Sequence, residues 1–251
     1  MEVLVDGVVC HYRQAGEGRD VLFLHGWGGE ADSFLPIFNA LQSSFRVTAI
    51  DFAGHGKSGR PPAEGWSVTE YMRWTTGVID ALRLAPCDIV AHSFGGRVSI
   101  LLCANRPHLV RKLVLTGAHG IVGKKTLKQR FRSRLYKILR GFAGILPGGE
   151  GLRKKLAVRF GSADYNALDE DMRRTFVKVV NQDLSGHLSS VQSPTLLVWG
   201  SEDTATPLWF GQLMEKEIPD AGLVVYEGCG HFAYLERAAD FAHVVSHFFQ
   251  N

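Results

Sequence analysis

Short apolar runs and helical stretches alternate along this chain. Continuous apolar runs predict strands at residues 21–24, 47–50, 89–91, 113–116, 196–199 and 223–226. The segments between them predict helices over residues 30–42, 68–84, 93–105, 207–217 and 238–249. Strands that are apolar throughout, rather than at every second residue, are typical of a sheet covered by helices on both faces. The pattern therefore predicts an α/β fold with a mostly parallel sheet.

A long, mostly helical stretch interrupts this alternation between residues 119 and 192. Its apolar side chains recur at spacings of three and four residues at Leu127, Phe131, Leu135, Ile138 and Leu139. This spacing predicts a helix with one apolar face. Helices inserted at this point would cover the carboxyl edge of the sheet as a lid. We therefore expect a core of residues 1–118 and 193–251 and a helical lid of residues 119–192.

The composition agrees with one large compact domain, since 45% of the 251 residues are hydrophobic and 21% are charged. No apolar run approaches the roughly 18 residues that cross a bilayer. The first residues predict a hairpin that turns at Asp6-Gly7 rather than an export signal. The four cysteines are scattered without the spacing of a metal site or a redox pair. We expect a cytoplasmic protein without integral membrane association.

Positive charge is concentrated in the expected lid. Residues 124–159 hold twelve Lys or Arg and one acid, Glu150, so this segment carries +11 while the whole chain carries +3. The rest of the chain is therefore at −8. A solvated helix face accounts for such a segment, and so does attraction of acidic substrates or anionic membrane surfaces. Nucleic acid is not expected as a partner because the segment contains no recognisable binding module.

A serine lies where an apolar strand passes directly into a helix. The sequence there is Ala91-His92-Ser93-Phe94-Gly95-Gly96, and small residues on both sides of Ser93 permit a sharp turn. Such a turn exposes the hydroxyl at the edge of the sheet and directs a helix N-terminus at developing negative charge. Serine is also favoured as a helix N-cap, so the segment by itself fits either a nucleophile or a cap.

Partners for a nucleophilic serine follow later strands. Asp203 comes just after the run that ends at Trp199-Gly200, at the edge where open α/β sheets bind ligands. Glu202 is its neighbour, but the spacing favours Asp203 as the orienting acid. His231 lies in a glycine-rich loop after the last strand and is the candidate base. The order Ser93, Asp203, His231 is the order of a catalytic triad on an α/β-hydrolase fold.

Several segments together resemble the α/β-hydrolase superfamily, in particular its lid-bearing serine hydrolases and esterases. The matching pieces span nearly the whole chain and are His25-Gly26-Trp27-Gly28-Gly29, the glycine-rich loop from Asp51 to Gly59, the Ser93 turn, Trp199-Gly200-x-x-Asp203 and Gly230-His231. The resemblance implies an oxyanion hole formed by the backbone N–H groups of Trp27 and Phe94. Ala91 stands where the family more often has glycine, and we expect the small alanine to keep the turn.

The resulting prediction is a serine hydrolase that cleaves small to medium carboxylic esters, with no metal and no organic cofactor. If the basic segment attracts substrates, these esters are anionic. His25, His119 and Phe232 are candidate pocket residues, although His119 is equally interpreted as an ordinary loop residue. His25, like His55 and His92, is expected to make structural hydrogen bonds rather than to transfer protons. Carbon–carbon bond hydrolases, thioesterases and lactonases use the same triad. A receptor or signalling protein with slow turnover is a further alternative, and the oligomeric state is left open.

Overall fold

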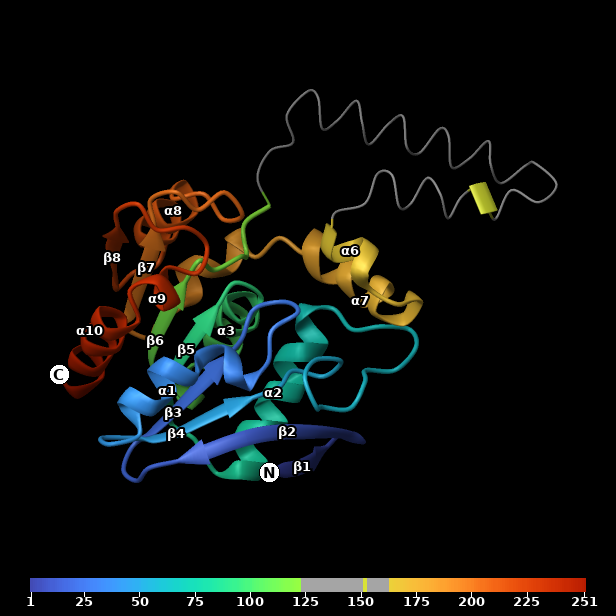
Figure 1. The fold of residues 1–251 in the computed structure, drawn as a ribbon, viewed down its shortest axis with the longest axis horizontal. Coiled ribbons are helices and arrows are strands. Elements are labelled where there is room, and N and C mark those ends of the chain that lie inside the picture. The colour runs from blue at the N-terminus through green and yellow to red at the C-terminus, as the bar shows by residue number, and fades with distance from the viewer. Residues whose placement is uncertain (123–150, 153–162) are drawn as a thin grey trace.

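The computed structural model describes residues 1–122, 151–152 and 163–251, and its centre is an eight-stranded sheet in the order β1-β2-β4-β3-β5-β6-β7-β8 (Figure 1). The strands are β1 Glu2–Val5, β2 Val8–Ala15, β3 Asp20–Leu24, β4 Arg46–Ile50, β5 Cys87–His92, β6 Val110–Thr116, β7 Thr195–Gly200 and β8 Ala221–Tyr226. From β4 to β8 all neighbours are parallel, whereas β2 is antiparallel to β1 and β4. The predicted mostly parallel sheet is confirmed.

Helices cover both faces of this sheet. The α-helices of the described residues are α1 Leu35–Leu41, α2 Val68–Leu82, α3 Phe94–Asn105, α6 Ala163–Ala167, α7 Glu170–Asn181, α8 Trp209–Glu217, α9 Ala233–Glu236 and α10 Ala238–Gln250, and of these α6 and α7 are not part of the layers on the sheet (Figure 1). Short 3₁₀ helices lie at Ala31–Phe34, Pro107–Leu109 and Ser185–Ser190. Figure 1 shows α1 beside α10, and α2 beside α3.

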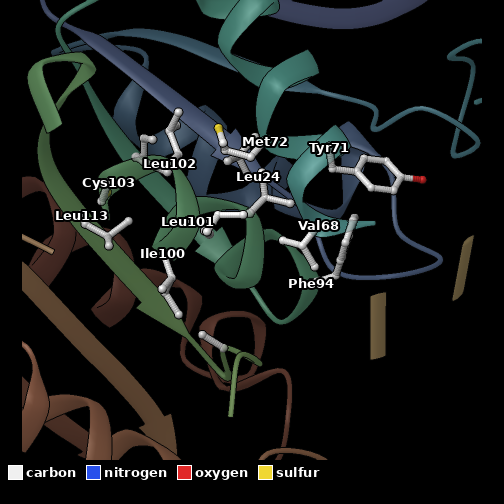
Figure 2. Packing of buried hydrophobic residues seen from close by; sticks show 14 of the residues in the cluster. Leu24, Val68, Tyr71, Met72, Phe94, Ile100, Leu101, Leu102, Cys103 and Leu113 are labelled. Atoms are coloured by element: carbon white, nitrogen blue, oxygen red, sulfur yellow. The ribbon is translucent and has the colours of Figure 1, made fainter. Parts of the chain in front are cut away.

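Two apolar clusters fill the space between helices and sheet, and neighbouring residues of one strand belong to different clusters. In β3, Leu22 and Leu24 pack with α2, α3 and α8, whereas Val21 and Phe23 pack with α1 and α10. The first cluster is seen in Figure 2, where Leu24 lies among side chains of α2 and α3. Because successive strand side chains point to opposite faces, a strand buried on both faces must be apolar at every position. This is why the runs were continuous rather than alternating.

The boundaries of several elements differ from the predicted ones for local reasons. The predicted helix over residues 30–42 is divided into the 3₁₀ helix Ala31–Phe34 and α1. The predicted helix over 93–105 begins one residue later, because Ser93 has φ +49° and no helical residue has that conformation. The hairpin turn occurs as expected, with left-handed conformations at Asp6 and Gly7.

Of the expected lid, the structure describes residues 119–122, 151–152 and 163–192. Asp169 is the N-cap of α7 and its side chain accepts a hydrogen bond from the N–H of Met172. The chain then returns to β7 through the 3₁₀ helix Ser185–Ser190. The amphipathic segment at residues 127–139 and nearly all of the basic segment lie outside the described residues. The division into core and lid therefore stays a prediction.

No helix of the described ranges is both long and apolar enough to cross a bilayer. The four cysteines Cys10, Cys87, Cys103 and Cys229 are all buried and unpaired. Each therefore packs as a small apolar side chain.

Candidate active site

Ser93 forms a strained turn between β5 and α3. Its backbone has φ +49° and ψ −105°, a conformation that residues with a Cβ rarely adopt. Two backbone hydrogen bonds hold this turn against the end of β6, from the N–H of Ser93 to the Thr116 carbonyl (3.2 Å) and from the N–H of His119 to the Ser93 carbonyl (3.0 Å). A Cβ on Gly95 would overlap the Leu24 carbonyl. Glycine is therefore required for α3 to begin so close to β3.

The side chain of Ser93 does not act as a helix cap. Ser93 occupies the N-cap position of α3, yet its hydroxyl accepts no hydrogen bond from the first turn of the helix. The Ser93 residue keeps 8% of its surface exposed. The capping interpretation of this serine therefore fails, and its hydroxyl is available for chemistry.

Asp203 is a buried carboxylate with donors at both oxygens. Oδ1 accepts hydrogen bonds from the backbone N–H groups of Ala205 and Thr206, both at 2.8 Å. Oδ2 accepts from the Thr206 hydroxyl at 2.6 Å and from Nδ1 of His231 at 2.8 Å. Burial raises the pKa of Asp203, but the bonds from His231 and Thr206 together outweigh burial and hold this pKa below its usual value. Glu202, by contrast, points to solvent.

His231 lies in the loop after β8, and its ring is oriented by the acid. Because an ionised carboxylate only accepts, Nδ1 of His231 carries the proton and Nε2 is the basic nitrogen. The loop is attached to the serine turn through His92, whose Nε2–H donates to the His231 carbonyl at 3.1 Å. The rings of His92 and His231 are 4.7 Å apart between centroids. Asp203 and His231 are thus in direct contact, beside the strand end that carries Ser93.

No hydrogen bond joins the Ser93 hydroxyl to His231 among the described residues. The two are neighbours through shared packing, since a Cβ on Gly117 would lie 3.1 Å from Nδ1 of His231, and the turn from Gly117 to His119 is also bonded to Ser93. In enzymes without substrate such contacts are often long and tighten when substrate binds.

Two backbone N–H groups beside Ser93 have no acceptor among the described residues. In the first turn of α3, Gly95 donates to the His25 carbonyl (3.0 Å) and Gly96 to the Ser93 carbonyl (3.1 Å), whereas the N–H of Phe94 has no such partner. The N–H of Trp27 is also open. A Cβ on Gly26 would lie 3.3 Å from Cβ of Ser93, so the loop that carries Trp27 adjoins the serine. Both N–H groups can therefore donate to an oxygen at this place.

His25, which the sequence placed in the candidate pocket, has both ring nitrogens bound by backbone. Nε2 accepts from the N–H of Phe52 at 2.9 Å, so Nδ1 carries the proton and donates to the Gly26 carbonyl at 2.7 Å. Burial lowers the pKa of His25 to about 3. His25 thus holds the loop beside the site and has no polar atom left for a ligand. His55 and His92 also bond to backbone carbonyls, as predicted.

Aromatic side chains surround the space next to the serine turn. The Trp27 ring lies edge-on to the rings of Phe94 (5.2 Å between centroids) and Phe176 (5.1 Å). Phe232 is 51% exposed and lies beside the rings of His92 and His231. Phe176, on α7, was not singled out in the sequence, because its place beside Trp27 depends on tertiary packing.

Thr206 was also missed from the sequence. It is fully buried, and its hydroxyl lies within hydrogen-bond distance of both Asp203 and Nδ1 of His231 (2.6 and 3.3 Å). The only signal is its position three residues after the acid, in a turn where a side-chain hydroxyl can reach back. No group of three metal-ligating side chains occurs within residues 1–122 and 163–251.

The sheet order, the serine turn and the Asp–His pair at the carboxyl edge define an enzyme of the α/β-hydrolase class. A model of the "Alpha/beta hydrolase family" matches residues 21–244, and the chain belongs to this family. It is 31% identical to the 2-hydroxymuconate semialdehyde hydrolase of Pseudomonas putida, over 98% of this chain and 92% of that one.

Solved structures agree with this assignment. Est816, described as an N-acyl homoserine lactone degrading enzyme, superposes with a TM-score of 0.77 and 27% identity, covering 99% of this chain and all of the other. An esterase from Exiguobacterium antarcticum superposes with a TM-score of 0.78 and 24% identity, covering 100% of this chain and 99% of the other. The second likeness supports the fold alone.

Proposed function

We propose that this hydrolase cleaves small to medium carboxylic esters through an acyl-serine intermediate. The observation that carries the proposal is the His231 ring, oriented by Asp203 so that its basic Nε2 is free, beside a strained serine whose hydroxyl caps no helix. A weak nucleophile becomes effective when an oriented base removes its proton. The two open N–H groups next to Ser93 support the same chemistry.

The proposed reaction proceeds in two halves. Oγ of Ser93 attacks the ester carbonyl while Nε2 of His231 takes its proton, and Asp203 stabilises the imidazolium that forms. The N–H groups of Phe94 and Trp27 donate to the oxyanion, each contributing typically about 10²- to 10³-fold in rate. His231 then gives the proton to the leaving alcohol, and water repeats the sequence on the acyl-serine to release the acid.

The substrate size is inferred from the surroundings of the serine. The aromatic rings of Trp27, Phe94 and Phe176 offer an apolar wall for an acyl or alcohol group. Such walls bind through burial of apolar surface and set no strict chemical requirement on the group bound. Esters of small to medium size fit this description best.

A second candidate is cleavage of a carbon–carbon bond next to a carbonyl group. The observation that favours it is the 31% identity to a 2-hydroxymuconate semialdehyde hydrolase along almost the entire chain. This reaction would use the same serine turn and the same Asp–His pair. The two candidates therefore differ in substrate and not in the residues that we assign.

The experiment is labelling with a fluorophosphonate probe, followed by turnover of p-nitrophenyl esters of increasing chain length. Wild-type protein should be labelled and should turn over repeatedly, and Ser93→Ala should lose both properties. Ser44→Ala, at an exposed serine, serves as the matched control and should behave as wild type. Labelling of Ser93→Ala at another residue would overturn the assignment of the nucleophile. Turnover of a 2-hydroxy-6-oxo-dienoate with poor turnover of every ester would favour the second candidate, and labelling without repeated turnover would favour a receptor.

A further inference from the structure

His119 lies between the serine turn and the base, although the mechanism above gives its side chain no task. Its backbone N–H donates to the carbonyl of Ser93 at 3.0 Å, and Gly117, two residues before it, packs against the His231 ring. The His119 ring meets the ring of Phe210 edge to face at 6.0 Å. A side chain that begins here lies at the carboxyl edge of the sheet, next to the reacting groups.

The His119 ring is polar, and no group within the described residues uses its hydrogen-bonding capacity. His25, His55, His92 and His231 each have a ring nitrogen that bonds to a carbonyl or a carboxylate. Nδ1 of His119 is buried and has no partner in the part of the chain that the structure describes. A buried polar atom without a partner costs free energy, which a bound ligand or a fixed tautomer can reduce.

The environment of Nδ1 determines which ring nitrogen carries the proton. An unpaired N–H is rarer in protein interiors than an unpaired acceptor, so the proton belongs on Nε2. Nε2 is not enclosed as Nδ1 is, and the residue keeps part of its surface exposed. Burial and the charge of Arg97 lower the pKa of His119 to about 4, so the ring is neutral near pH 7. His119 is therefore a neutral donor through Nε2–H.

A buried cation is attached to the segment beside this donor, since Arg97 bonds the Gln182 carbonyl and the N–H of Leu184 donates to the carbonyl of Gly120, the residue after His119, at 2.8 Å. Arg97, on α3, is 4% exposed and donates from Nη1 to the carbonyls of Val179 (3.0 Å) and Gln182 (2.8 Å). No carboxylate of the described residues lies within ion-pair distance of it, and Asp183 acts on it only from farther away. Burial lowers the pKa of Arg97 to about 10, so it remains protonated at neutral pH. Its charge favours a negative group at His119.

We propose that His119 selects substrates that carry a second acceptor oxygen beyond the scissile carbonyl. The Nε2–H of His119 donates a hydrogen bond to this oxygen, and the charge of Arg97 makes a carboxylate the preferred acceptor. The inference rests on the proposed function, because it places this acceptor in the substrate of the Ser93 site. Arg97 acts through its field and not by contact, since its guanidinium is buried and bonded to the end of α7.

The test compares matched pairs of esters that differ only in a carboxylate. The acyl-side pair is the mono-p-nitrophenyl ester of glutaric acid and p-nitrophenyl valerate. The alcohol-side pair is the valerate ester of 4-hydroxybenzoate and phenyl valerate. In one of the pairs, His119→Leu should lower kcat/KM for the carboxylate ester about tenfold or more, while the neutral ester changes less than about threefold. His119→Gln, which keeps a donor, should restore most of the preference.

Equal losses on both members of each pair, or no loss on either, would overturn the role of His119. A readout without turnover separates this failure from a failure of the proposed function. In Ser93→Ala protein, imidazole ¹⁵N spectra should show His119 protonated at Nε2, with a shift of Nε2 on addition of monomethyl glutarate or 4-hydroxybenzoate. A proton on Nδ1, or no shift with either ligand, would overturn the inference even if ester turnover is confirmed. Absent fluorophosphonate labelling of wild-type protein would instead contradict the proposed function.

Discussion

Replacement of Thr206 by valine isolates one hydrogen bond to Asp203, the carboxylate that we propose orients His231. Valine has nearly the shape of threonine, so Thr206→Val keeps the packing of a fully buried side chain and removes only the hydroxyl at 2.6 Å from Oδ2 of Asp203. Asp203 retains the two backbone donors and Nδ1 of His231. A hydrogen bond to a charged group contributes about 2 kcal/mol, so the free energy of unfolding should fall by about that much near neutral pH.

The pH dependence of this loss follows from the direction of the pKa shift. The pKa of Asp203 is lower in the folded protein than in the unfolded chain, where it is about 3.9. The stabilisation is therefore complete above the unfolded pKa and is lost as the pH falls through the folded pKa. The difference between wild type and Thr206→Val should stay constant from about pH 6 to 8 and should shrink as the pH falls below about 4.

Urea unfolding at pH 7 measures the free energy, and thermal unfolding should show a midpoint lower by roughly 4 to 8 °C for a domain of this size. Thr206→Ser is the matched control, because it keeps the hydroxyl and loses one methyl group, at a cost of about 1 kcal/mol that does not depend on the protonation of Asp203. A loss below about 0.5 kcal/mol in Thr206→Val, or a loss that persists unchanged below the folded pKa, would refute the role of this hydroxyl.

Two further predictions concern the turn and the buried histidines. Gly95→Ala should destabilise the protein by about 3 kcal/mol and slow fluorophosphonate labelling, because the new Cβ overlaps the Leu24 carbonyl. Gly222→Ala is the control, since a Cβ there has no atom within 4 Å, and it should change neither thermal unfolding nor labelling appreciably. Burial lowers the pKa of His25 to about 3 and that of His55 to about 4, whereas both are about 6.5 in the unfolded chain. Below about pH 6.5 the unfolded chain therefore binds more protons than the folded protein. The free energy of unfolding should fall there by roughly 1 kcal/mol per pH unit for each histidine. Urea unfolding at pH 7 and pH 5.5 should therefore show a smaller pH effect in His55→Gln than in wild type, and an equal effect would contradict the prediction.

The sequence predicted the sheet well because the strands have a simple physical signature. A strand such as β3, buried on both faces, must be apolar throughout, and that pattern is visible without any tertiary information. The order of strands in the sheet was not predicted, since pairing is decided by contacts between distant segments. The start of α3 was misplaced by one residue because the left-handed conformation of Ser93 is imposed by its neighbours, not by the serine itself.

Within the site, the sequence found the residues that follow strand ends and missed those placed by packing. Asp203 and His231 follow β7 and β8, and parallel strands bring such residues to one edge. The assignment of their catalytic roles stays a prediction until Ser93 is tested. Thr206 and Phe176 carry no comparable signal, since a threonine in a turn and a phenylalanine on a helix are common.

The groups proposed to react and two of the side chains proposed to select substrates come from different parts of the chain. Ser93, Asp203, His231 and the open N–H group of Trp27 belong to turns and loops that follow strands, and the open N–H group of Phe94 belongs to the first residue of α3. The donors to Asp203 come from its own turn and from His231. Of the side chains proposed to distinguish one substrate from another, His119 comes instead from the segment after β6 and Phe176 from α7, which Arg97 attaches to α3. Because the rigid sheet sets the geometry of the reaction, sequence changes in α7 should alter KM and substrate preference more than the rate of fluorophosphonate labelling. Such a separation would explain how one fold accommodates relatives named for different substrates.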